Sequence, residues 1–167
     1  ARQWINTGII VSTKTKDGIT DIRKGKRRAL TNRPVVVLID EGSASASEIL
    51  SGAIKENNRG KLVGKKTFGK GLVQSVRSLP DGSGLTVTVA KYLTPNGRDI
   101  NKNGIEPDIR AELSVNDDNK LTNSDLGTLK DSQYVVAENL LLKAYRIENN
   151  INSYNPMKSN IKYALKK

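Results

Sequence analysis

The chain of 167 residues contains neither cysteine nor histidine. The lack of cysteine excludes disulfides, thiol catalysis and thiolate metal sites from this chain. The lack of histidine excludes the Ser-His-Asp arrangement as the means of activating a serine hydroxyl. A serine nucleophile here therefore needs a lysine or a carboxylate as its base, and a Ser-Lys dyad is the leading candidate.

Aromatic residues make up only 4% of the chain, and no apolar run approaches the ~20 residues of a membrane span. No signal peptide is present, and the chain starts at Ala1, on what reads as the tail of a helix ending near Asn6. We therefore expect the sequence to be a piece of a longer protein. On that expectation the missing signal peptide is uninformative about the compartment.

The formal net charge of +11 raises nucleic acid as a partner. The basic residues are scattered, however, and no aromatic residues interleave with the clusters at 24–28, 65–66 and 158–167 as a base-stacking surface requires. We interpret the charge as a solvated basic surface and expect no nucleic-acid partner. A preference for acidic substrates or anionic membrane surfaces is left open, and a steep salt dependence of DNA affinity would support the nucleic-acid alternative.

The order of strand and helix patterns predicts an α/β fold. Strands are predicted at 8–13, 19–22, 34–39, 62–63, 72–78 and 85–92, and helices at 44–57 and 132–149. The β-branched run Pro34–Ile39 is typical of a strand buried on both faces, and Gly60 is expected to end the first helix. Residues 95–108 form a long loop, 117–123 a surface segment, and 150–167 have room for one short helix.

Two short segments hold the candidate chemistry. The first, Gly42–Glu48, is rich in serine and opens the predicted helix, where unpaired N–H groups point outward. Ser43, Ser45 and Ser47 are all candidates, and Ser47, deepest in the helix, is expected to be structural. The second segment, 67–71, places Lys70 between two glycines, which permit a close backbone approach. In an extended strand Lys70 and Gln74 would share one face.

The chain resembles the carboxyl-terminal processing (tail-specific) proteases, and its motifs are most similar to those of the cyanobacterial branch. The resemblance rests on five ordered blocks of sequence over about 75 residues. Asp40 is one departure from the family pattern, because the family more often has Asn at that position. The blocks are Pro34–Ile39, Gly42–Ile49, Val63–Ser75, Val89–Pro95 and Gly104–Asp108.

The resemblance implies a role for each candidate residue. It matches Ser45 to the family's nucleophile, Lys70 to its base and Gln74 to a supporting glutamine. It also implies that the N–H of Ala46 stabilises the oxyanion, and that Glu48 has a structural or a supporting catalytic role. A lysine base must be neutral, and lowering an amine pKa of about 10.4 toward 7 to 8 costs about 4 kcal/mol. Burial of the Lys70 amine, or the neighbouring positive charges of residues 65 and 66, would lower its pKa by disfavouring the charged form.

The resemblance further implies a ClpP/crotonase-like β-β-α spiral core, truncated at the N-terminus. Residues 1–113 would form the protease core and 114–167 a helical extension packing on it, without the PDZ module of the family. The expected function is cleavage of C-terminal extensions from protein substrates in the periplasm or thylakoid lumen, without cofactor or metal. Weak or no activity is expected of the piece alone. A non-catalytic peptide-binding module and a crotonase-type acyl-CoA enzyme are the alternatives, and the oligomeric state stays open.

Overall fold

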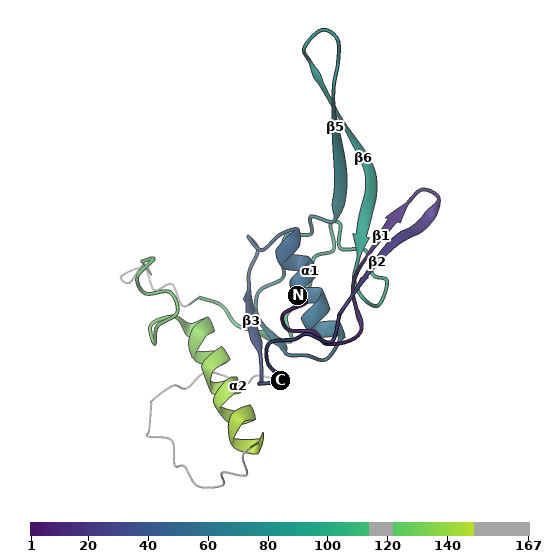
Figure 1. Ribbon diagram of the computed structural model, residues 1–167. Helices are drawn as coiled ribbons and strands as arrows, with labels where there is room; N and C mark the ends of the chain where they lie inside the picture. Colours follow the sequence, from purple (N-terminus) through teal and green to yellow (C-terminus); the bar gives the residue numbers. More distant parts are fainter. Residues whose placement is uncertain (114–121, 149–167) are drawn as a thin grey trace.

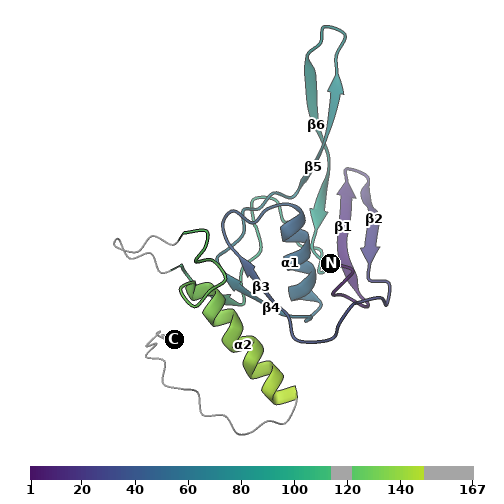
Figure 2. The ribbon, with the colours of Figure 1, turned by 60° about the vertical axis from the view of Figure 1, so that its left-hand side comes forward.

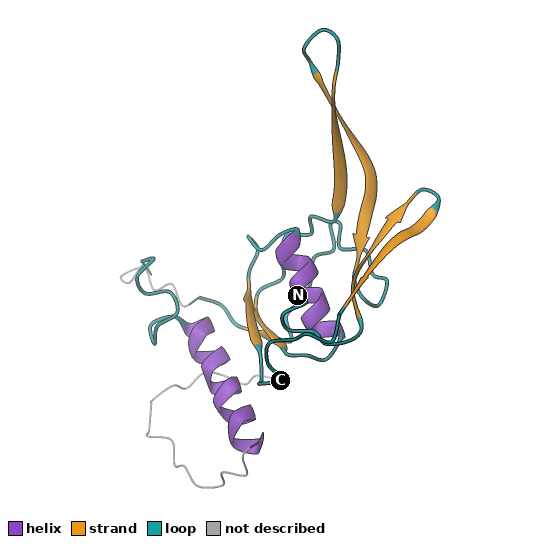
Figure 3. Cartoon of the chain, viewed as in Figure 1, coloured by secondary structure: helices purple, strands orange, loops and turns teal. Residues whose placement is uncertain are grey.

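The computed structural model describes residues 1–113 and 122–148, and within them the chain is a mixed α/β structure (Figures 1 and 3). The predicted segment 150–167 lies outside the described residues, and so do residues 117–121 of the segment predicted at 117–123. The elements are β1 (Ile9–Thr15), β2 (Gly18–Lys24), β3 (Val36–Ile39), α1 (Ala46–Glu56), β4 (Lys61–Gly64), β5 (Leu72–Ser78), β6 (Gly84–Leu93), β7 (Ile109–Arg110) and α2 (Ser132–Glu148).

Two antiparallel hairpins form a four-stranded sheet in the order β2-β1-β6-β5. An Asp-Gly pair stands at each hairpin turn, Asp17-Gly18 in the first and Asp81-Gly82 in the second. Gly18 adopts φ 125° at the first turn and Gly82 φ 83° at the second. The β5–β6 hairpin projects far beyond the rest of the molecule, as Figure 1 shows.

The second sheet is parallel, in the order β3-β4-β7. Helix α1 lies between the two sheets and contacts β1 and β4, as the two views in Figures 1 and 2 show. Its inner face carries Ala53 and Ile54, both fully buried. Together with residues of both sheets they form one apolar core, which comprises Ile5, Ile10, Val11, Ile39, Ala53, Ile54, Leu62, Ile100 and Ile105. Burial of these side chains fixes α1 against the sheets.

Two details of the predicted elements are wrong. Strand β3 is not buried on both faces, since Leu38 is 40% exposed and only Ile39 is buried. Gly60 does not provide the left-handed residue after α1; Asn58 does, with φ 52°, and Gly60 instead lies close to the carbonyl of Val35. At the start of the chain a single turn, in which Ile5 N–H donates to the Ala1 carbonyl, directs Ile5 into the core.

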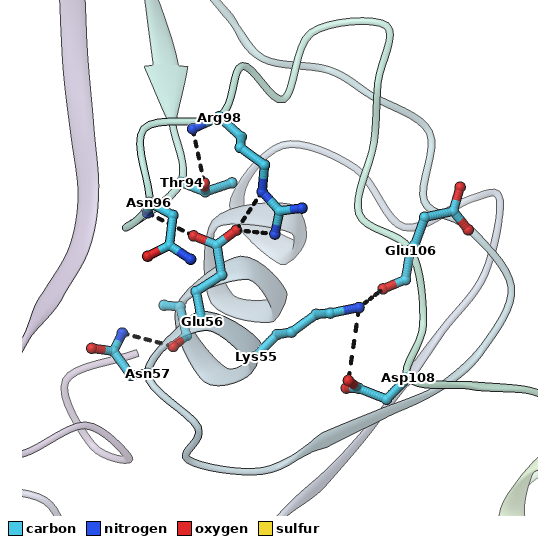
Figure 4. Close-up of polar contacts among 9 residues, drawn as sticks. Lys55, Glu56, Asn57, Thr94, Asn96, Arg98, Glu106 and Asp108 are labelled. Atoms are coloured by element: carbon cyan, nitrogen blue, oxygen red, sulfur yellow. Dashed lines mark hydrogen bonds and ion pairs between the residues drawn. The ribbon is translucent and has the colours of Figure 1, made fainter.

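The loop predicted at 95–108 is held at the C-terminal end of α1 (Figure 4). The Glu56 side chain, 3% exposed, accepts hydrogen bonds from the Arg98 guanidinium and from Asn96 N–H at 2.7 Å. Lys55 Nζ donates to the Glu106 carbonyl at 2.6 Å and lies 3.8 Å from Asp108. Adjacent acidic and basic residues at the end of one helix therefore fix both ends of a long loop.

Helix α2 contacts β3 and β4 on the side away from α1 (Figure 2). Gln133 is buried at its first turn, where its side-chain amide donates to the Ala111 carbonyl at 2.9 Å. The predicted helix at 132–149 is confirmed over its described residues, Ser132–Glu148. Within 1–113 and 122–148, neither helix is long and apolar enough to cross a membrane.

Candidate functional site

The turn between β3 and α1 is built by Asp40 and Ser43. The Asp40 carboxylate accepts hydrogen bonds from Gly42 N–H at 3.0 Å, Ser43 N–H at 2.9 Å and the Ser43 hydroxyl at 2.9 Å. Asp40 N–H donates back to Ser43 Oγ at 3.1 Å. The Ser43 hydroxyl is thus used within the turn. Ser47 is exposed, and its expected structural role stays a prediction.

Ser45 is the N-cap residue of α1 and has an unusual backbone conformation, with φ 54° and ψ −111°. Such positive-φ geometry costs of order 1–3 kcal/mol for a residue with a side chain and is concentrated at functional sites. A sharp strand-to-helix turn of this kind presents a serine at the end of a helix. Ala46, the first residue of α1, is exposed beside it, and N–H groups in the first helical turn have no acceptor within the helix.

Glu48 is the most constrained side chain of the site. It is fully buried, at 0% exposure, in the first turn of α1. One of its oxygens accepts from the Thr67 hydroxyl at 2.5 Å and from Gly69 N–H at 2.7 Å. The other accepts from Ser45 N–H at 2.9 Å and from Lys70 N–H at 2.8 Å. Four donors thus occupy the four lone-pair positions of the carboxylate, which is what a buried carboxylate needs.

This carboxylate brings the two predicted catalytic segments together. A single Glu48 oxygen binds the backbone nitrogens of Ser45 and Lys70, which are therefore no more than two hydrogen-bond lengths apart. A backbone hydrogen bond from Phe68 N–H to the Ser43 carbonyl at 3.0 Å joins the same segments. Within the described residues no hydrogen bond joins the Ser45 hydroxyl to the Lys70 amine, and the Lys70 side chain is exposed.

The glycines on either side of Lys70 permit a close approach of another loop. Gly69 adopts φ 90°, and its carbonyl accepts from Lys102 N–H at 2.8 Å. A Cβ on Gly71 would lie 2.5 Å from the backbone nitrogen of Asn101. The loop at 100–104 therefore lies directly against the segment that carries Lys70.

We expect Gly71→Ala to lower the free energy of unfolding by about 1–3 kcal/mol, because the added methyl group displaces this loop. Gly84→Ala is the matched control, since its Cβ would meet nothing closer than a Val76 methyl at 3.9 Å. Urea denaturation of both variants tests the effect. Equal losses in the two variants would contradict the close approach.

Gln74 lies on β5, where it is exposed and pairs with Thr88. Lys70 does not share an extended strand with Gln74 as expected, because β5 begins at Leu72 and Lys70 precedes the strand. An irregularity in the pairing with β6 also falls between Val73 and Gln74. An orientation of the Gln74 side chain toward Lys70 therefore stays a prediction.

The two lysines expected to act on Lys70 by their charge are both paired with carboxylates. Lys65 donates to Glu41 at 2.9 Å, a hydrogen bond that lowers the pKa of Glu41 and raises the pKa of Lys65. Lys66 lies 3.1 Å from Glu106. Both cations are therefore neutralised locally, which argues against them as the cause of a neutral base.

Thr67, which is 4% exposed, belongs to the site although no local sequence pattern indicates it. Its hydroxyl donates to Glu48 and accepts from Ile105 N–H at 2.8 Å, so it connects the site to the end of the long loop. The sequence marks Thr67 only as the first residue of the glycine-flanked segment, directly before Phe68. No local pattern predicts its hydrogen bond to Glu48, which lies 19 residues earlier in the chain.

This chain is similar to known proteins both in its sequence and in its structure. The sequence profile described as peptidase family S41 matches residues 1–111. A carboxyl-terminal-processing protease of Picosynechococcus sp. is 47% identical over 141 residues, which cover 84% of this chain and 33% of that protein. Its namesake in Synechocystis sp. is 45% identical, covering 84% and 32%.

A solved structure titled photosystem II D1 C-terminal processing protease is also similar. It superposes with a TM-score of 0.64 at 46% identity, covering 66% of this chain and 29% of that one. The chain thus spans about a third of the length of the relatives it matches.

Proposed function

Because the chain belongs to peptidase family S41, we propose that it is the catalytic core of a serine endopeptidase that removes C-terminal extensions from protein substrates. The observation that carries the proposal is the strained turn at Ser45, tied through Glu48 to the backbone of Lys70. This is an arrangement of a serine and a lysine in a chain without histidine or cysteine. A nucleophile and its base need such mutual positioning by the scaffold.

In the proposed reaction the neutral amine of Lys70 takes the proton of the Ser45 hydroxyl. The Ser45 oxygen attacks the scissile carbonyl, and the N–H of Ala46 donates to the oxyanion that forms. Lys70 then gives the proton to the leaving amine, and the C–N bond breaks to leave an acyl-enzyme on Ser45. Water, deprotonated by the same lysine, hydrolyses the ester and restores the free serine. Gln74 would orient the amine without adding charge.

The role proposed for Glu48 is positioning. Its buried carboxylate touches only donors of this chain, so it acts on the reaction through Ser45 and Lys70. Removing the carboxylate would leave Ser45 free to relax from its strained conformation.

We place this activity in the thylakoid lumen or the periplasm, since relatives are cyanobacterial and one solved relative is titled as processing photosystem II D1. The β-β-α spiral, and the division at residue 113 between a core and an extension, are part of the same proposal. The PDZ module would lie outside this chain. Because the Lys70 side chain is exposed and unconnected to the Ser45 hydroxyl, we expect residues 1–167 alone to act slowly or not at all.

The experiment that tests the function uses a form of the protein that spans the length of its relatives. It is incubated with a folded protein that carries a short C-terminal extension and with the same protein lacking the extension. Mass spectrometry should show release of the extension from the first and no cleavage of the second. Absence of cleavage by the long form would contradict the proposed function.

A further inference from the structure

The β1–β2 and β5–β6 hairpins separate from each other above a short stretch of pairing, as Figures 1 and 2 both show. Strand β1 pairs with β6 only where Ser12–Lys14 face Leu93–Lys91. Beyond this point the hairpins enclose an open hollow of about 720 Å³, lined by 14–17 of the first hairpin and by residues of the second that include Leu72, Arg77 and 88–91. We call this hollow the notch. Its volume is in the range of sites that bind small ligands or a few residues of peptide.

One side of the notch is a strand edge. Strand β6 pairs with β5 from Gly84 to Lys91, but within the described residues no strand pairs with its other edge before Lys91. Backbone N–H and C=O groups on an open edge are ready to bind an added strand. An extended peptide that enters the notch would continue the sheet where β1 departs from β6.

The rim of the notch is basic. Lys14, Lys16 and Arg77 are exposed, and none has an ion pair in the described part of the chain, whereas the acidic contribution to the lining is Asp17. Lys14 also lies directly opposite Lys91 in the strand register, an arrangement that destabilises a sheet when both residues are charged.

A carboxylate of the chain already offsets one of these cations. Lys91 donates to Asp99 at 2.6 Å. Partial burial raises the pKa of the Asp99 carboxyl, but the hydrogen bonds from Lys91 and Asn101 N–H outweigh it, so that this pKa lies below its ordinary value. Asp99 is thus ionised at neutral pH and neutralises Lys91. The three remaining cations keep the rim positive.

Between the charges the notch presents apolar side chains. Leu72 is 37% exposed and Val89 47%, while Ala90 is buried. Exposed apolar side chains flanked by unpaired cations fit a ligand that alternates apolar and acidic residues. A polar, extended nucleic acid would find no aromatic ring in this lining on which to stack.

From the open edge, the basic rim and the apolar floor, we propose that the notch binds an acidic, extended segment of the protein substrate as an added strand beside β6. This proposal rests on the proposed function, since it assigns a substrate class to the same protein. Leu72 stands two residues after Lys70, so a bound segment lies next to the candidate site. Selection of acidic segments would then add to the recognition of the C-terminus.

Binding is measured with the 167-residue chain carrying Ser45→Ala, so that no cleavage contributes. The probes are a fluorescent peptide that alternates valine with glutamate, the same peptide with glutamine in place of glutamate, and the glutamate peptide with alternate backbone nitrogens methylated. We expect the glutamate peptide to bind about tenfold more tightly than the glutamine peptide, as a few partly exposed ion pairs allow. N-methylation on the edge that faces β6 should remove most of this affinity.

The matched variants are Lys14→Glu with Arg77→Glu on the rim, and Lys26→Glu with Arg28→Glu on a remote exposed segment. The rim variant should lose about tenfold in affinity for the glutamate peptide and the remote variant less than about twofold. Equal losses would show that net charge alone attracts the peptide and would overturn the proposal. Unchanged binding of the N-methylated peptide would overturn the added strand.

Anionic phospholipid vesicles form the last arm of the experiment. Vesicles that bind the chain through Lys14 and Arg77, while the glutamate and glutamine peptides bind equally, would assign the notch to a membrane surface and overturn the peptide proposal. Because every arm measures binding with the nucleophile removed, a missing peptidase activity leaves these results unaffected. Specific binding with no activity would thus contradict only the proposed function.

Discussion

Replacing Ser45 or Lys70 with alanine is expected to reduce peptide hydrolysis by at least about 10³-fold in a form of the protein that spans its relatives' length. Each change removes one member of the proposed nucleophile-base pair, and no histidine or cysteine of this chain can substitute for it. Turnover of a peptide with a C-terminal extension is the measurement. Circular dichroism should show unchanged secondary structure, because Ser45 is half-buried and Lys70 is exposed.

Two control variants distinguish the proposed nucleophile and base from neighbouring residues. Ser43→Ala removes two hydrogen bonds within the turn and should lower the free energy of unfolding by about 1–2 kcal/mol while most activity is retained. Gln74→Ala should reduce the rate less than either member of the pair. Retained turnover in Ser45→Ala together with its loss in Ser43→Ala would move the nucleophile to Ser43.

Replacing Glu48 with alanine is expected to cost about 3–5 kcal/mol of unfolding free energy and to abolish activity as well. The change leaves four donors, including Ser45 N–H and Lys70 N–H, without their acceptor in a buried site. Glu48→Gln should be damaging too, because the amide keeps the shape but replaces one acceptor oxygen with a donor. Urea denaturation and peptide turnover are measured on the same preparations.

Glu41→Ala is the control for this variant. Glu41 is a carboxylate on the same turn, 67% exposed in its side chain, and its partner Lys65 is also at the surface. Surface ion pairs of this kind contribute little, so we expect no measurable change in stability. If Glu48→Ala unfolded at the same urea concentration as Glu41→Ala, the positioning role of Glu48 would be wrong.

Local chemistry made much of the fold predictable. The Asp-Gly pairs at 17–18 and 81–82 mark the two hairpin turns, and helical periodicity marks α1 and α2 nearly to their ends. The resemblance to carboxyl-terminal processing proteases is confirmed by the family match and by cyanobacterial relatives. The assignment of Ser45, Lys70, Gln74 and Ala46 to catalytic roles stays a prediction.

What sequence patterns missed depends on contacts between distant segments. Leu38 lies among apolar residues in the sequence but is 40% exposed, because its burial depends on which elements pack on the parallel sheet. The four partners of Glu48 come from two segments about 20 residues apart, so no periodicity reports them. The notch likewise follows from where β1 stops pairing with β6, a property of tertiary structure.

The central claim is that Ser45 is the nucleophile of the site that Glu48 organises. Its most direct test is to trap the acyl-enzyme with a peptide ester and to locate the adduct by tandem mass spectrometry. Trypsin should release the adduct on a peptide that ends at Lys55 and contains Ser43, Ser45, Ser47 and Ser51, so fragment ions distinguish the serines. We predict an adduct on Ser45 that is lost in Lys70→Ala. An adduct on another serine, or one that persists unchanged in Lys70→Ala, would contradict the account.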